Sequence, residues 1–141
     1  MKINVGIIGC GSIAKHRHAP EYRANPLVDE IIFYDRNRHR AEALARLFNG
    51  RVANTIDDLY NDSTITAISD CSSNEYHHIH STEALLAGKH VLCEKPLAIS
   101  VNHAEDIINA AKKSGKKLMV GHNQRFTKVH QKVKQMIEQK E

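Results

Sequence analysis

The chain has 141 residues, of which 41% are hydrophobic and 26% are charged, and its formal net charge is +4 at pH 7. This length and composition are typical of one globular domain with a proper core. Basic residues are spread over many segments and aromatic residues make up only 5% of the chain, which argues against nucleic-acid binding. No apolar stretch is long enough to span a bilayer, so we expect no membrane-spanning segment.

The cysteines indicate a reducing compartment. Cys10, Cys71 and Cys93 are odd in number, lie far apart and fit no zinc spacing, which is typical of reduced thiols that are buried as small apolar groups. The apolar run at residues 3–8 is too short for a secretory signal. We therefore expect a soluble, cytoplasmic protein.

The first fifteen residues predict a strand, a tight turn and the start of a helix. Residues 3–8 are almost continuously apolar, as in a strand buried on both faces of a parallel sheet. A G-x-G-x-x-A pattern follows, in which one glycine makes the turn, the next admits a pyrophosphate and the alanine allows close packing. Amides at the helix start would then face the phosphates. The residues expected at the pyrophosphate are Gly9, Gly11, Ser12, Ile13 and Ala14.

A carboxylate follows the second expected strand. A helix should run to about Ala24, with Pro20 marking a break or a restart, and the apolar run at 31–34 then ends in Asp35. Asp35 lies 21 positions beyond Ala14, where the dinucleotide fingerprint places an acid on the ribose hydroxyls. Asp35 alone could equally be a solvated turn residue, but the glycine turn before it favours the ribose role.

Arginines directly after Asp35 bear on the choice of cofactor. The guanidinium groups of Arg36, Arg38 and Arg40 could hold the extra phosphate of NADP, whereas the Asp35 carboxylate would oppose it. We therefore expect NAD, with NADP as the alternative, and place Asp35 and Arg36 beside the adenosine ribose.

Strands and helices alternate through the remainder of the chain. Residues 72–74 are expected to supply a loop and a helix cap, and Ile79 and Ile108 are expected to face the core. Six strands joined by crossovers predict an α/β fold with a doubly wound, Rossmann-type parallel sheet and helices on both faces. Further strands are expected at 52–53, 65–71, 91–93 and 118–120. Further helices are expected at 38–48, after Thr55, at 75–87, from Ser100 to Gly115 and from about 129 to the end.

Five blocks of sequence resemble the glucose-fructose oxidoreductase, inositol dehydrogenase and MocA (Gfo/Idh/MocA) family of nicotinamide-dependent sugar oxidoreductases. The most specific block is AGKHVLCEKPLA at 87–98. The other four are GIIGCGSIAK at 6–15, Asp35, SSNEYHH at 72–78 and VGHNQRF at 120–126. The resemblance covers essentially the whole chain.

The resemblance implies roles for residues beyond the glycine turn. Ser72, Asn74 and His77 correspond to a loop on the nicotinamide side of the cofactor, with a serine at position 73 where proline is usual. Glu94 matches a residue that approaches the nicotinamide ribose. Lys95 matches a lysine that binds the substrate hydroxyl and assists proton transfer, where a cation would stabilise an alkoxide as hydride departs. The alternative for Lys95 is an exposed lysine before a turn proline.

Three histidines close together raise the question of a metal site. On a helix, His77 and His80 share a face, while His78 points about 100° away from His77. Because the three side chains converge poorly, we expect no metal here.

The resemblance also implies how the chain is organised. We expect residues 1–122 to form the dinucleotide-binding domain and residues 123–141 to begin the crossover toward a second, substrate-binding domain that the chain lacks. The implied reaction is hydride transfer between a nicotinamide cofactor and a sugar or polyol, with little or no turnover by this chain alone. The alternative is a stand-alone, non-catalytic nucleotide-binding or interaction module. It would form homo-oligomers through an apolar stripe on the last helix, made of Val129, Val133, Met136 and Ile137.

Overall fold

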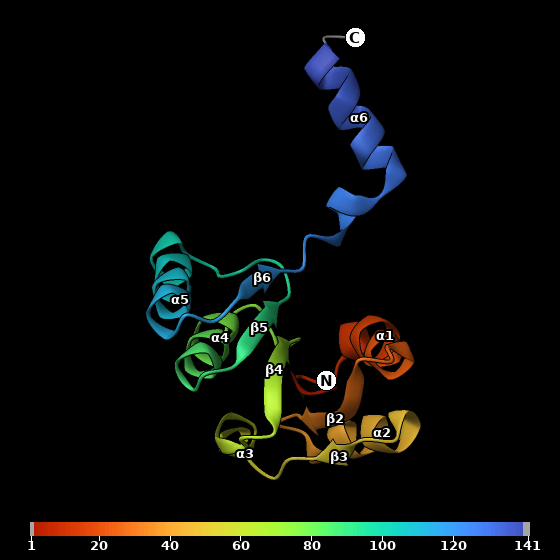
Figure 1. Ribbon diagram of the computed structural model, residues 1–141, viewed down its shortest axis with the longest axis vertical. Helices are drawn as coiled ribbons and strands as arrows, with labels where there is room; N and C mark the ends of the chain where they lie inside the picture. Colours follow the sequence, from red (N-terminus) through yellow and green to blue (C-terminus); the bar gives the residue numbers. More distant parts are fainter. Residues whose placement is uncertain (1, 140–141) are drawn as a thin grey trace.

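Six strands form one parallel sheet in the computed structural model, which describes residues 2–139 (Figure 1). The strands are β1 (Ile3–Ile8), β2 (Val28–Tyr34), β3 (Arg51–Val52), β4 (Ile65–Asp70), β5 (His90–Cys93) and β6 (Leu118–Val120). Their order is β3-β2-β1-β4-β5-β6, and every neighbouring pair is parallel. This order confirms the doubly wound fold and places the topological switch point between β1 and β4, where such sheets bind ligands.

Helices cover both faces of the sheet. The helical elements are η1 (Ala14–His18), α1 (Ala19–Ala24), α2 (Arg38–Phe48), α3 (Ile56–Asn61), α4 (His77–Leu86), α5 (Val101–Ser114), η2 (Asn123–Phe126) and α6 (Lys128–Gln139). In Figure 1, α1 and α2 lie on one side, whereas α4 and α5 lie on the other. Neighbouring residues of β1 serve the two sides: Ile7 packs with Leu44 of α2, and Ile8 packs in the cluster that holds Leu59 and Ile107. The expectation that β1 is buried on both faces is therefore confirmed.

The helix after the glycine turn contains a π-helical segment. Helical structure runs from Ser12 to Ala24 as expected, but residues 14–18 form the π-helix η1, in which the Ala19 N–H donates to the Ala14 carbonyl oxygen. Pro20 then lies in the first turn of α1, where its missing N–H costs little. Near the proline, the structure thus changes from π-helix to α-helix without a break in the helical backbone.

Helix α4 differs from the expectation. It begins at His77 instead of residue 75, and its N-cap residue, Tyr76, makes no side-chain capping bond. The Ser72 hydroxyl, expected near the cap, donates to Asp70 Oδ1 at 2.6 Å. Ile79 is 47% exposed, and the face against the sheet carries Ser81 and Ala84. Buried Ser81 is accommodated because its hydroxyl donates to Asp70 Oδ2 at 2.9 Å.

The other caps follow the sequence pattern. Thr55 and Asp58 form the expected capping box at the start of α3, and the Ser100 side chain accepts from the His103 N–H at the start of α5. Gly115 ends α5 in the left-handed conformation, with φ of 68°. In α5 the inward residue is Ile107, whereas Ile108 is 40% exposed, which corrects that expectation.

The last helix stands away from the sheet. Helix α6 extends from the rest of the molecule beyond β6 and has no buried residue (Figure 1). Its apolar side chains are exposed, among them Val129 at 71% and Ile137 at 71%. Within residues 2–139, no helix combines the length and the apolar character needed to cross a membrane.

Candidate functional site

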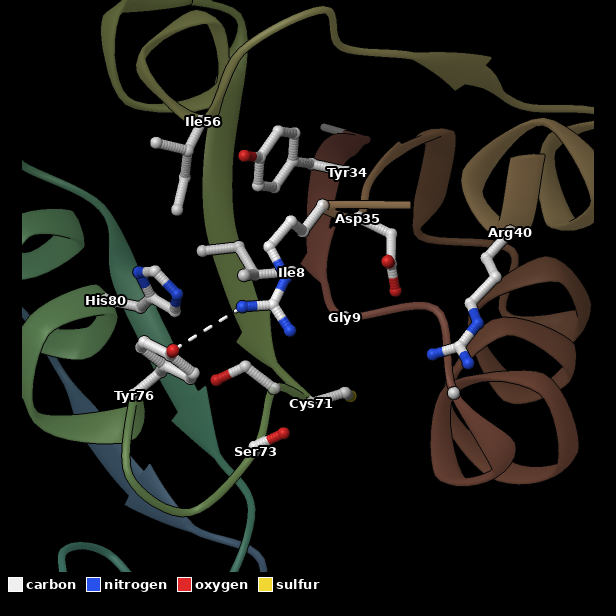
Figure 2. Close-up of a pocket in the computed structure, with 13 residues that line it drawn as sticks. Ile8, Gly9, Tyr34, Asp35, Arg40, Ile56, Cys71, Ser73, Tyr76 and His80 are labelled. Carbon is white, nitrogen blue, oxygen red and sulfur yellow. Dashed lines mark hydrogen bonds between the residues drawn. The ribbon is translucent and has the colours of Figure 1, made fainter. Parts of the chain in front are cut away.

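A cavity of about 300 Å³ opens at the switch point of the sheet (Figure 2). The glycine turn after β1, the residues after β2 and the loop that joins β4 to α4 line most of it, and α2, α3 and α4 each add one residue. Its lining residues are Ile8, Gly9, Gly11, Tyr34, Asp35, Arg36, Arg40, Ile56, Cys71, Ser72, Ser73, Tyr76 and His80. The cavity therefore brings together the glycine turn, Asp35, Arg36 and Ser72, as the sequence predicts.

The two glycines of the turn are required for different reasons. Gly9 has a φ of +88°, and a Cβ built there would lie 2.6 Å from the Cys71 carbonyl oxygen, so the fold itself demands glycine. A Cβ built on Gly11 would meet nothing within 4 Å. Since no packing within the chain explains Gly11, its bare backbone is suited to the close approach of a ligand at the start of the helix.

The Asp35 carboxylate is bound to the glycine turn. Its Oδ2 accepts from the Cys10 N–H at 2.7 Å, and its Oδ1 accepts from the Asn37 N–H at 2.7 Å. These two bonds fix the carboxylate beside the cavity, and Figure 2 shows it next to Gly9. A carboxylate has about four acceptor positions, so Asp35 retains capacity for hydroxyl groups of a ligand.

Arginines and aromatic rings form further walls of the cavity. The Arg36 guanidinium donates to the Tyr76 hydroxyl at 3.5 Å and lies 5.9 Å from the centre of that ring (Figure 2, dashed line). Tyr76 in turn stacks on His80, with the ring centres 5.8 Å apart. Burial lowers the pKa of His80, which favours the neutral imidazole at neutral pH. Neither Tyr76 nor His80 was predicted from the sequence to line the cavity.

His77 lies beneath the site and does not line it. Its side chain is fully buried, with Nδ1 2.7 Å from the Pro96 carbonyl oxygen and Nε2 3.1 Å from that of Ser72. His77 thus ties the loop after β4 to the segment after β5. Asn74 is exposed and is not among the residues that line this cavity.

The residues expected at the pyrophosphate differ in their exposure. Ser12 is exposed, Ile13 is half-buried and Ala14 is fully buried against the core. None of these three side chains lines the cavity. Exposed Ser12 leaves both its hydroxyl and its backbone amide accessible to a phosphate, whereas buried Ala14 packs against the core.

Glu94 and Lys95 follow β5, on the other side of the switch point from Asp35. Glu94 is 9% exposed and lines a second cavity, of about 220 Å³, together with His18 and Tyr22. Lys95 is exposed directly after it and lines neither cavity, and its peptide bond to Pro96 is cis. The structure thus keeps Lys95 accessible at the carboxyl end of the sheet.

The cysteines act as small buried groups. All three are unpaired and buried, as expected. Burial raises the pKa of the Cys10 and Cys93 thiols to about 12, and it also raises that of Cys71. Protonated thiols are poor nucleophiles, so these side chains contribute packing. Among residues 2–139, no three His, Cys, Asp or Glu side chains gather in a way that could hold a metal ion.

The family follows from the comparison with known proteins. A family model described as "Oxidoreductase family, NAD-binding Rossmann fold" and named for Gfo, Idh and MocA matches residues 3–122. The chain belongs to the Gfo/Idh/MocA family. The fold, the glycine turn and the site's position at the sheet edge therefore belong to a nicotinamide-dinucleotide-binding domain.

Relatives of this Gfo/Idh/MocA domain include sugar dehydrogenases. The chain is 34% identical to the glucose-6-phosphate 3-dehydrogenase of Bacillus subtilis over 86% of its own length and 34% of that enzyme. It is 31% identical to the D-glucoside 3-dehydrogenase of Escherichia coli over 96% of the chain and 39% of that enzyme.

Solved structures of the family agree with this fold. A 3-ketoreductase from Actinomadura kijaniata, solved in complex with NADP, superposes with a TM-score of 0.90 and 30% identity, covering 99% of this chain and 44% of that one. The Gfo/Idh/MocA domain described here thus spans 34% to 44% of the length of these three relatives.

The site's residues fit the cofactor of the family. The open space at Gly11 suits a pyrophosphate, the fixed acceptors of Asp35 suit ribose hydroxyls, and the rings of Tyr76 and His80 offer flat apolar surface.

Proposed function

We propose that this chain is the cofactor-binding part of an oxidoreductase that transfers hydride between a nicotinamide dinucleotide and a sugar or polyol. The observation that carries the proposal is the juxtaposition of the glycine turn, Asp35 and the segment Glu94–Lys95 along one edge of the sheet. Relatives named for oxidation of glucose 6-phosphate and glucosides support the substrate class.

The two ends of the cofactor would bind on opposite sides of the switch point. Asp35 follows β2 and would hold the adenosine ribose, while Gly9 and Gly11 would admit the pyrophosphate between β1 and β4. Glu94 and Lys95 follow β5 and would lie at the nicotinamide end, with Ser72 on the loop between. When bound, the nicotinamide ring supplies the hydride acceptor or donor.

Lys95 is the proposed catalytic residue of this chain. Its ammonium would bind the hydroxyl that is oxidised and assist removal of its proton, because a nearby cation stabilises the developing alkoxide. Exposure of Lys95 at the sheet edge leaves its side chain free to reach a substrate. Asn123 and Arg125, on η2, mark the expected crossover toward a substrate-binding domain.

We propose that NAD is preferred over NADP. The Asp35 carboxylate is held by two backbone amides, so in its proposed place at the adenosine ribose it could not easily turn away from a 2′-phosphate. Arg36 and Arg40 line the same cavity and would partly compensate, which makes NADP the second choice.

We further propose that the chain alone turns over sugars slowly or not at all, since hydride transfer needs the substrate held against the nicotinamide. Nuclear magnetic resonance tests the proposed site directly. Addition of NADH should shift the amide signals of Gly11, Asn37 and Lys95, on both sides of the switch point. Shifts confined to α6, or absent altogether, would overturn the proposal.

A second candidate is a non-catalytic module that self-associates. The exposed apolar stripe of α6 favours it, because Val133 and Ile137 lie open along one helix. Light scattering distinguishes the two: a dimer that Val133→Asp dissociates supports the module, and a monomer contradicts it. We also propose a cytoplasmic location, which the three unpaired thiols support.

A further inference from the structure

Four polar side chains form a chain of hydrogen bonds behind the nicotinamide end of the site. The Tyr22 hydroxyl donates to Ser69 Oγ at 3.1 Å, Ser69 Oγ lies 2.7 Å from His18 Nδ1, and His18 Nε2 lies 2.8 Å from Glu94 Oε1. His18, Ser69 and Glu94 are 8%, 0% and 9% exposed. They come from η1, from β4 and from the segment directly after β5, so the chain of bonds links three parts of the fold.

The partners define the direction of these bonds. Burial raises the pKa of Tyr22, which keeps its hydroxyl a donor to Ser69. When Ser69 donates to His18 Nδ1, an imidazole that carries its proton on Nε2 can donate to Glu94 Oε1. This tautomer gives every bond in the series one donor and one acceptor.

The arrangement is not a hydrolytic triad. A serine, a histidine and a glutamate are in contact, but Ser69 is fully buried within β4 and no substrate can reach its hydroxyl. The member of the series that directly precedes Lys95 is Glu94, so the other side chains act on the site through its carboxylate.

Glu94 is held on its other sides as well. Its Oε2 accepts from the backbone N–H of Lys95 at 3.2 Å. A Cβ built on Gly121 would lie 3.2 Å from Glu94 Oε1, so the glycine leaves room for the carboxylate between β5 and β6. His18 supplies the bond that connects this carboxylate to the helix following the glycine turn.

The position of His18 follows from the helix that carries it. His18 ends η1, and π-helical turns of this kind are frequent at functional sites. The same segment carries Ala14, which is fully buried behind the glycine turn. The π-helical segment thus connects the glycine turn, through Ala14, to the His18 side chain that contacts Glu94.

We propose that His18 is a positioning residue, which fixes the Glu94 carboxylate and the adjoining backbone of Lys95 relative to the glycine turn. This role rests on the proposed function, since it concerns the nicotinamide end of the cofactor. No motif in the sequence points to this role, because His18 lies 76 positions from Glu94.

Two ligands separate this role from a general loss of structure. NADH spans the whole switch point, whereas ADP lacks both the nicotinamide ring and its ribose. His18→Ala should weaken NADH binding about tenfold, the value of one hydrogen bond to a charged group, and change ADP binding less than about twofold. His18→Gln, which keeps a donor toward Glu94, should recover most of the NADH affinity. His16→Ala, at an exposed histidine of the same turn, is the matched control and should change neither.

Equal losses for both ligands, or an NADH affinity that His18→Ala leaves unchanged, would overturn the proposal. Nuclear magnetic resonance spectra of the unbound chain test the positioning role of His18 separately from the proposed function, because they need no cofactor. The unbound chain should show the His18 imidazole protonated on Nε2, and His18→Ala should shift the Lys95 amide signal while His16→Ala does not. If the unmodified chain binds neither ligand, the proposed function fails, and an unmoved Lys95 signal overturns the positioning role independently.

Discussion

The carboxylate of Asp35 accepts a hydrogen bond from the backbone N–H of Cys10 at 2.7 Å, which joins the end of β2 to the middle of the glycine turn. Two features that lie 25 positions apart in the sequence are thus one structural unit. The unit explains how the acid that we propose for the ribose and the turn that we propose for the pyrophosphate keep a fixed separation.

Removing the charge of Asp35 should change cofactor preference. Asp35→Asn weakens acceptance from ribose hydroxyls and removes the repulsion of a 2′-phosphate, so the ratio of NADH to NADPH affinity should fall by about tenfold or more. Fluorescence titrations with both cofactors measure the ratio. Asp29→Asn, at an exposed carboxylate of β2 paired with Lys2, is the control. An unchanged ratio in Asp35→Asn would contradict the assignment of this carboxylate.

Alanine substitutions at Gly9 and Gly11 should affect different properties, stability in the first case and cofactor binding in the second. Gly9→Ala should destabilise the fold by about 2 kcal/mol or more, because φ is +88° and the new Cβ meets the Cys71 carbonyl. Gly11→Ala should leave the free energy of unfolding nearly unchanged but weaken NADH binding, because its Cβ enters the ligand's space. Urea denaturation and NADH titration of both variants test this. The account is wrong about Gly11 if Gly11→Ala binds NADH as well as the unmodified chain.

The cap of α5 should contribute measurably to stability. Ser100→Ala removes the acceptor for the His103 N–H and should lower the free energy of unfolding by about 1 kcal/mol. Ser100→Asp retains an acceptor and is the matched control, with little loss expected. Equal stability of Ser100→Ala and the unmodified chain in urea would show that the cap is dispensable.

Stability should fall in alkaline solution because of the buried thiols. The pKa of Cys10 is raised from 9.0 to about 12 in the folded state. Because the Cys10 thiol ionises at lower pH in the unfolded chain than in the folded one, its contribution to the free energy of unfolding is complete below pH 9. That contribution is lost as the pH rises toward 12. Cys10→Ala should therefore show a smaller decrease in unfolding free energy between about pH 8 and pH 10 than the unmodified chain. Identical decreases would contradict the burial argument for this thiol.

Local sequence predicted the parts of the fold whose causes are local. The continuous apolar run of β1, the capping box at Thr55 and the stop at Gly115 each depend on residues only a few positions apart. Asp35 was found because a known spacing links it to the glycine turn. The Gfo/Idh/MocA resemblance added Glu94 and Lys95, whose chemical roles no periodicity reveals.

Long-range contacts explain what sequence reasoning missed. Ser81 faces the sheet in place of Ile79 because Asp70 offers it a buried acceptor, and hydropathy alone cannot foresee that bond. The contact of His18 with Ser69 spans 51 positions and depends on the order of the strands. Tyr76 lines the cavity because the loop after β4 turns its ring toward Arg36, a placement that no motif encodes.

Binding of NADH to the purified chain, measured by isothermal titration calorimetry, tests the central claim most directly. The account predicts saturable binding of one NADH per chain below millimolar concentration. It also predicts that Gly11→Ala, which should keep the fold, loses most of that affinity. Absence of binding by the correctly folded, unmodified chain up to millimolar NADH would contradict the account.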